Sequence, residues 1–189
     1  MSSLAESEKK ILLEVARRTL IAAVQRNEIP SMPDMASLSG PGGAFVTITR
    51  NGRLRGCIGR LPCNASLVEV VALCARAVPT EDPRFPRVRP DELPAIEIEL
   101  SVLSPLFQIT PEQIEPGKHG LFVSNDTRRG VLLPQVALQF HWGGMRFLEA
   151  ACEKAGLARD AWKHPATLVQ GFTAEVFSER QLGIAEPSS

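Results

Sequence analysis

The sequence has no tyrosine and few aromatic residues, eight phenylalanines and two tryptophans in 189 residues. Its 21 basic and 21 acidic side chains cancel, and it contains no basic run. General nucleic-acid binding requires a clustered positive surface, and single strands are commonly held by stacking aromatics, so this composition argues against such a role. Binding of a nucleotide or RNA through a local group of arginines stays a third alternative. These arginines are Arg53, Arg55, Arg60 and Arg84.

The chain also lacks a long apolar run. No uninterrupted stretch approaches the roughly 18 to 20 residues that span a bilayer, and the first ten residues are polar and charged. We therefore expect a cytoplasmic protein with no membrane segment. The absence of a secretion signal and the irregular cysteine spacing predict reduced thiols rather than a disulfide framework. The four cysteines are Cys57, Cys63, Cys74 and Cys152.

Motifs that hold common cofactors are missing as well. The sequence contains no G-x-G-x-x-G before a helix, no Walker-type loop, no G-x-S-x-G elbow and no EF-hand. It has no H-x-H, H-x-x-x-H or C-x-x-C spacing for zinc, and no cysteine cluster for an iron–sulfur centre. We therefore predict no cofactor and no metal, and the chain is not itself a radical SAM enzyme.

Hydrophobic periodicity predicts an α+β fold of mainly antiparallel sheet with flanking helices. Helices are expected at 8–26, 66–78, 134–140 and 145–155. Strands are expected at 44–49, 54–58, 95–103, 120–124, 131–133 and 167–177. Asn51-Gly52 predicts a tight turn between the first two strands. Ser7 is the expected N-terminal cap of the first helix. Asn64 or Ser66 is the expected cap of the second helix, and that helix should end before Pro79.

Cys57 is the most informative residue of the predicted first hairpin. It lies between Gly56 and Gly59 and near Arg55. A thiol acts as a nucleophile or ligand only as thiolate, and a neighbouring guanidinium favours that ionised form. The glycines would let a ligand approach closely. The same pattern fits a small buried cysteine in a strand whose glycines permit tight packing, so the residues alone leave both interpretations open.

Other polar residues are further candidates for a site. Two prolines stiffen the segment 82–86. In it, Arg84 could hold a carboxylate or phosphate, and Asp82 could orient Arg84 or take a proton. The same residues fit an internal Asp82–Arg84 ion pair that only fixes the loop equally well. Glu97 and Glu99 share one side of their predicted strand, where they could act as a base or simply meet solvent. The near-neutral titration of His119 suits an acid or base, although a lone histidine in a turn is commonly structural.

Several motifs together resemble the family named after the AMME-syndrome candidate protein, whose bacterial members are called AmmeMemoRadiSam system protein A. The motifs lie at 54–59, 82–86, 96–105, 117–121, 132–137 and 152–157. The resemblance extends over nearly the whole chain, in order and at family-like spacing. It implies a single AMMECR-type domain over 4–182, built of two closely packed lobes with an internal duplication of a β-α-β-β unit, and a disordered tail at 183–189.

The resemblance also implies two partners, a Memo-like protein related in fold to extradiol dioxygenases and a radical SAM protein. Our leading hypothesis is an enzyme, or enzyme component, that acts on a small anionic or aromatic metabolite. The expected catalytic residues are Cys57 as thiol centre, with Asp82 and His119 in proton transfer. The expected substrate-binding residues are Arg55, Arg84, Phe85 and Gln135. The alternative is a non-catalytic adaptor for the Memo-like partner, in which the segment 54–59 is a contact or packing motif.

Overall fold

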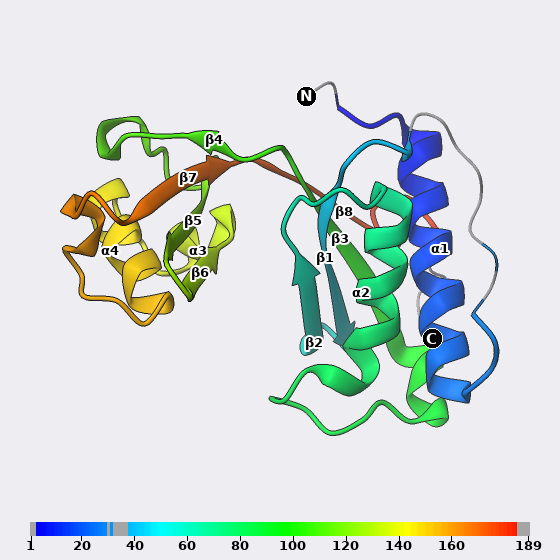
Figure 1. Ribbon diagram of the computed structural model, residues 1–189. Helices are drawn as coiled ribbons and strands as arrows, with labels where there is room; N and C mark the ends of the chain where they lie inside the picture. The colour runs from blue at the N-terminus through cyan, green and yellow to red at the C-terminus, as the bar shows by residue number, and fades with distance from the viewer. Residues whose placement is uncertain (1–2, 30, 32–37, 185–189) are drawn as a thin grey trace. The chain divides into compact units, whose positions relative to one another are not determined.

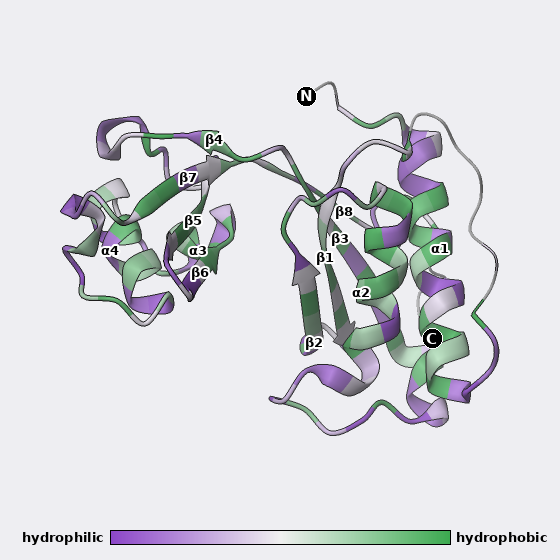
Figure 2. Cartoon of the chain, in the orientation of Figure 1, coloured by the Kyte–Doolittle hydropathy of each residue, from purple (hydrophilic) through white to green (hydrophobic). Residues whose placement is uncertain are grey.

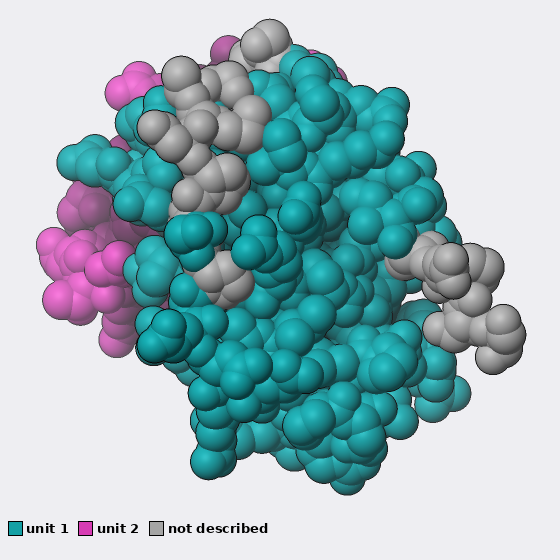
Figure 3. All heavy atoms as spheres, turned by 90° about the vertical axis from the view of Figure 1, so that its right-hand side faces the viewer, with its two compact units in different colours: residues 1–103, 175–189 teal, residues 104–174 magenta. Residues whose placement is uncertain are grey.

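The computed structural model describes residues 3–29, 31 and 38–184. The chain divides into two compact units, unit 1 with residues 1–103 and 175–189, and unit 2 with residues 104–174 (Figure 3). Within the described residues each unit contains a four-stranded sheet and its own helices (Figure 1). The predicted α+β class is therefore confirmed.

Unit 1 is a sheet with two helices against one of its faces (Figure 1). Its strands lie in the order β2-β1-β3-β8, and β1 is antiparallel to both β2 and β3. The elements are α1 (Glu6–Gln25), β1 (Gly43–Arg50), β2 (Arg53–Arg60), α2 (Leu67–Glu81), the short η2 helix (Pro90–Ala95), β3 (Ile96–Leu103) and β8 (Ala174–Ser178). Alternate apolar residues of β1 and β3 form one core with apolar residues of α1 and α2. Figure 2 colours most of α2 as hydrophobic, in agreement with its many buried residues.

The two helices of unit 1 differ from the prediction at their ends. The cap of α1 is Ala5 rather than Ser7. Ser66 caps α2 as expected, since its hydroxyl accepts from the Glu69 amide at 3.3 Å. However, α2 continues through Pro79 to Glu81 instead of ending before the proline. Pro79 lies in the last turn and is buried, so apolar packing offsets the backbone hydrogen bond that it cannot donate.

Unit 2 is a second antiparallel sheet with two short helices. Its strands lie in the order β4-β7-β5-β6. The elements are β4 (Phe107–Gln108), η3 (Pro111–Gln113), β5 (Gly120–Asn125), β6 (Arg128–Leu132), α3 (Pro134–Gln139), α4 (Gly144–Lys154), η4 (Ala161–Lys163) and β7 (Leu168–Phe172). Its core includes Leu121, Phe147, Leu148 and Cys152, so that cysteine is a packing residue.

The prediction of a single last strand over 167–177 is wrong, because the segment forms two strands. It consists of β7 in the sheet of unit 2 and β8 in the sheet of unit 1. Between them, the Thr173 carbonyl accepts from the Ser104 amide at 2.9 Å, and the Thr173 amide donates to the Ser104 hydroxyl at 2.9 Å. The alternating residue pattern of the sequence continues across Thr173, so a period of two does not reveal that the chain changes sheets there.

The two sheets share one topology. In each unit the first hairpin strand, β1 or β5, lies between its hairpin partner and the strand that follows the helices. The repeated order is therefore β-β-α-β, in place of the expected β-α-β-β. Both sheets also pair a phenylalanine with a glycine. A Cβ atom at Gly59 would lie 2.1 Å from the Phe45 ring, and one at Gly120 would lie 2.3 Å from the Phe172 ring. These glycines make room for a ring on the neighbouring strand.

The predicted tail at 183–189 lies mostly outside the described residues. Gly183 still belongs to a turn, in which the Ile184 amide donates to the Glu179 carbonyl at 2.9 Å. Residues 185–189 are not among those described. None of the helices in the described part of the chain combines the length and apolar character that a membrane crossing requires.

Candidate functional site

A β-bulge determines the direction in which Cys57 points. The turn residues Asn51 and Gly52 have φ values of 52° and 73°, as a tight hairpin requires. The register begins with Arg50 opposite Arg53 but shifts after Thr49, so that Thr47 lies opposite Cys57 and Arg55 is the extra residue. A one-residue shift exchanges the two faces of a strand. The bulge therefore moves Cys57 from the helix-covered face to the opposite face of the sheet.

That opposite face carries a row of polar side chains across three strands. Thr47 of β1 is in register with Cys57 on one side and with Glu99 on the other, and Thr49 is in register with Glu97. We call these five residues the polar face. All five are half-buried, and the Thr47 hydroxyl donates a hydrogen bond to the Cys57 sulfur at 3.3 Å. Thiol, hydroxyl and carboxyl are thus neighbours on successive strands.

The electrostatic environment keeps the Cys57 thiol protonated at neutral pH. Burial raises the pKa of Cys57, and the negative charges of Asp82 and Glu99 act in the same direction. The Thr47 hydrogen bond and the positive charge of Arg84 oppose this shift without cancelling it. Burial, helped by the charge of Glu97, also raises the pKa of Glu99. Cys57 and Glu99 therefore both have pKa values above their ordinary ones.

Asp82 links the end of α2 to the backbone of β2. Its carboxylate accepts from the Cys57 amide at 2.9 Å, from the Arg84 amide at 3.1 Å, and from Arg84 Nε and Nη2 at 2.9 and 2.7 Å. Its pKa lies well below the ordinary range, chiefly because of the Arg84 hydrogen bonds. An ionised carboxylate with all these partners is a poor proton acceptor, and its contacts hold Arg84 and the Cys57 backbone in place. The predicted part of Asp82 in proton transfer stays a prediction.

Arg84 itself remains accessible. Asp82 engages its Nε and Nη2 atoms, yet more than half of the side chain is exposed, 56%. The guanidinium carbon lies 5.5 Å from the centre of the Phe85 ring. Arg84 and Phe85 together present a guanidinium group beside an aromatic surface. Their roles in substrate binding stay predictions.

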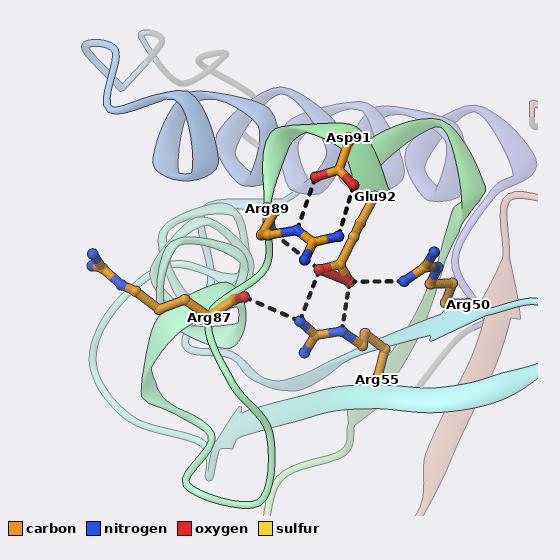
Figure 4. A network of polar contacts seen from close by, with 6 residues as sticks. All are labelled: Arg50, Arg55, Arg87, Arg89, Asp91 and Glu92. Carbon is orange, nitrogen blue, oxygen red and sulfur yellow. Dashed lines mark hydrogen bonds and ion pairs between the residues drawn. The ribbon is translucent and has the colours of Figure 1, made fainter.

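Arg55, also expected to bind substrate, is engaged inside unit 1 (Figure 4). Its Nε and Nη2 donate to the Glu92 carboxylate at 2.8 and 3.2 Å, and Nη2 also donates to the Arg87 carbonyl at 3.2 Å. Arg50 lies 3.5 Å from the same carboxylate, which is buried, and the Arg89 amide donates to it at 3.2 Å. The hydrogen bonds from Arg55 are the main reason that the pKa of Glu92 is lowered. Arg55 therefore fixes the bulge to η2 and to the loop that precedes it.

The other two predicted site residues, His119 and Gln135, belong to unit 2. His119 is buried; its Nδ1 accepts from the Glu115 amide at 3.2 Å, and its ring lies edge-on to Phe107 with centroids 5.7 Å apart. These contacts stabilise the turn before β5. Gln135 is exposed on the first turn of α3. Roles for both in catalysis or binding stay predictions.

Thr47 is the site residue that the sequence did not reveal. The hairpin turn alone would place Thr47 opposite Gly56, and only the bulge at Arg55 brings it to Cys57. Among the described residues, no group of three or more His, Cys, Asp or Glu side chains is arranged to hold a metal ion.

Comparison with known proteins identifies the family of this chain. The AMMECR1 family profile matches residues 13–177. The chain belongs to the AMMECR1 family. The resemblance predicted from the motifs is thereby confirmed, and both the Cys57 hairpin and the segment 82–86 lie inside the matched range.

Relatives in the AMMECR1 family match almost the full chain. Protein Mbar_A1807 of Methanosarcina barkeri is 36% identical over 189 residues, covering 94% of this chain and 93% of the relative. Protein MK0488 of Methanopyrus kandleri is 37% identical over 185 residues, covering 92% and 89%. The crystal structure of the uncharacterized protein PH0010 from Pyrococcus horikoshii is similar with a TM-score of 0.81 and 35% identity, covering 88% of this chain and 89% of that one.

Proposed function

We propose that this AMMECR1 protein is an enzyme, or a component of one, that acts on a small anionic metabolite at the polar face of unit 1. The observation that carries the proposal is the row of Cys57, Thr47 and Glu99 on three adjacent strands, next to the accessible guanidinium of Arg84. Thiol sites used in nucleophilic catalysis combine a thiol, a proton acceptor and a group that orients the reactants.

Each residue has a distinct part in this proposal. Arg84 binds the negative group of the metabolite, and the ring of Phe85 provides a surface for an aromatic or apolar portion. The Thr47 hydroxyl, which already donates to the sulfur, stabilises the thiolate as it forms. Glu99 is the acceptor for the thiol proton, because within the described residues its carboxylate forms no ion pair, whereas Asp82 is paired with Arg84. Asp82 holds Arg84 and the Cys57 backbone in place.

Charge discrimination in cysteine labelling tests the role of Arg84. Iodoacetate and iodoacetamide differ in charge but alkylate the same atom, and the exposed Cys63 is an internal reference. The iodoacetate to iodoacetamide rate ratio should be higher at Cys57 than at Cys63 by about fivefold, the factor given by about 1 kcal/mol for opposite charges in contact in water. Peptide mass spectrometry reads both sites in one sample.

Two matched variants give this experiment its control. R84Q should reduce the ratio at Cys57 to that of Cys63 or below it, because the positive charge beside the sulfur is lost while the negative charges of Asp82 and Glu99 remain. R89Q removes an arginine with the same bidentate contact to an aspartate, Asp91, and should leave the ratio unchanged. Equal ratios at the two cysteines in the wild type, or no response to R84Q, would contradict the proposed anion site.

A second candidate function, the adaptor, is favoured by an apolar surface on unit 2. Leu138, Phe140 and Met145 are 58%, 55% and 47% exposed, and Phe140 stacks on Trp142 with ring centroids 4.7 Å apart. We call these four residues the α3–α4 patch. Exposed apolar groups that are close together mark interaction surfaces. In this candidate function the patch binds the Memo-like protein, with the radical SAM protein in the same assembly.

A pull-down with the purified Memo-like protein separates the two functions. F140S should abolish capture if the α3–α4 patch is the contact, whereas L168S, which changes a leucine of β7 with 47% exposure, should not. Wild-type capture that F140S leaves intact would remove the patch from the interaction. Failure of the wild type to capture the partner would remove this candidate function.

A further inference from the structure

Unit 1 also contains a polar hollow whose described lining residues do not include any residue of the polar face. It has a volume of about 310 Å³, and its lining includes Arg26, Arg76 and Arg87. Arg26 directly follows α1, Arg76 is in the second half of α2, and Arg87 precedes η2. The wall between them includes Ala22 and Ala23, whose small side chains leave the space open.

Among the described residues, none is a partner for the charge of these three arginines. Their guanidinium groups take part in no ion pair and no side-chain hydrogen bond within residues 3–29, 31 and 38–184. By contrast, Arg17, Arg55, Arg84, Arg89, Arg146 and Arg159 all form hydrogen-bonded pairs with carboxylates. Three guanidinium groups around one small volume repel each other unless an anion lies between them.

The backbone that carries these arginines is held in place. The Arg87 carbonyl accepts from Arg55, and in Figure 4 the Arg87 side chain points away from the cluster around Glu92. Arg26 is the left-handed cap of α1, with φ of 60°, and its amide donates to the Ala22 carbonyl. Arg76 and Thr80 lie one turn apart on α2, and both line the hollow. The site therefore needs only side-chain movement to bind a ligand.

The charge in the hollow favours an anion. Glu81 is the one carboxylate among its described lining residues. The carboxyl ends of α1 and α2 add partial negative charges of about half a unit each at most. Three full positive charges exceed these contributions, and the planar guanidinium group matches the oxygen pairs of phosphates and carboxylates.

We propose that this hollow binds a small polyanion, a metabolite that carries phosphate groups or several carboxylates. The site is separate from the polar face, and it does not depend on the chemistry proposed for Cys57. It would give the protein a second ligand, held by three arginines that the sequence motifs did not single out.

Calorimetric titration at low salt with pyrophosphate, and separately with citrate, tests this site and distinguishes phosphate from carboxylate ligands. At least one of the two should bind saturably. R76Q should weaken that binding by at least about tenfold, since hydrogen bonds to charged groups are strong. E81Q should strengthen it, because the opposing charge is lost. R129Q removes an exposed arginine of β6 and is the matched control.

Two results would overturn the proposal. One is the absence of saturable binding of either probe to the wild-type protein. The other is an equal loss in R76Q and R129Q, which would indicate a general charge effect. Because E81Q is expected to gain affinity, its result cannot be mistaken for damage to the fold, and a loss of affinity in E81Q would count against the site.

Discussion

Replacing Asp82 with asparagine removes the charge that joins the end of α2 to β2. The Asp82 side chain is 3% exposed, and its carboxylate accepts four hydrogen bonds, two from the Arg84 side chain and two from backbone amides. Asparagine keeps one acceptor oxygen but loses the ionic component. We expect D82N to lower the free energy of unfolding of unit 1 by about 2 kcal/mol, within the range for a hydrogen bond to a charged group.

Asp91 provides a matched control for this prediction. Arg89 donates to Asp91 at 3.0 and 2.8 Å, in the same bidentate geometry that Arg84 uses on Asp82, but the Asp91 side chain is 64% exposed. Exposed ion pairs contribute about 0 to 1 kcal/mol. D91N should therefore have a small effect, and the difference between the two variants measures the consequence of burial.

Urea unfolding followed by two signals locates the effect. Trp142 and Trp162, the only tryptophans of the sequence, both belong to unit 2. Tryptophan fluorescence therefore reports on unit 2, whereas far-ultraviolet circular dichroism reports on both units. D82N should lower the midpoint of the circular dichroism transition more than D91N does. Equal midpoints for the two variants would refute the argument from burial.

The pH dependence of the D82N effect has a definite sign. The pKa of Asp82 is lowered in the folded protein, so the unfolded state binds more protons as the pH falls. The stabilisation is complete above the unfolded pKa of about 3.9 and is lost progressively below it. The difference between wild type and D82N should thus be constant near neutral pH and shrink below about pH 4. A difference that persists unchanged at pH 2 would contradict this assignment.

Two further substitutions test the packing and the buried charge network of unit 1. G59A should lower the free energy of unfolding by about 1 to 3 kcal/mol, the usual cost of overpacking, because the new methyl group would overlap the Phe45 ring. G40A is the control and should change the urea midpoint little, because a Cβ atom there would have no neighbour within 4 Å among the described residues, adjacent residues aside. E92Q should lower the free energy of unfolding by about 2 kcal/mol by weakening the charged hydrogen bonds to Arg55, and a urea midpoint equal to wild type would show that the network contributes nothing.

Much of the fold was predictable because its signals are local. The Asn51-Gly52 turn, the Ser66 cap and the alternation along β3 each depend on a few adjacent residues. The passage of the chain from β7 to β8 was not predictable, because side-chain alternation is the same whether or not a strand changes sheets. The prediction that α2 ends before Pro79 is wrong, because the proline is buried in the last turn and its packing offsets the missing amide hydrogen.

The candidate site was predictable only in part. The sequence identifies Cys57 and the pair of Asp82 and Arg84 as candidates. A thiol between glycines and a charged loop flanked by prolines can both be recognised from neighbouring residues. The contact of Thr47 with Cys57 depends on the extra residue Arg55 in β2. A bulge has no distinct signature in the pattern of this hairpin, so the side of the sheet on which Cys57 lies required the structure.

The most direct test of the central claim is protection of Cys57 by an unreactive anionic compound. Benzoate carries a carboxylate for Arg84 and a ring for Phe85, and it cannot alkylate a thiol. If the polar face binds small anionic metabolites, rising benzoate should slow iodoacetamide labelling of Cys57 to a plateau, leave Cys63 unaffected, and lose its effect in R84Q. A Cys57 labelling rate that is independent of benzoate would contradict a binding site at the polar face.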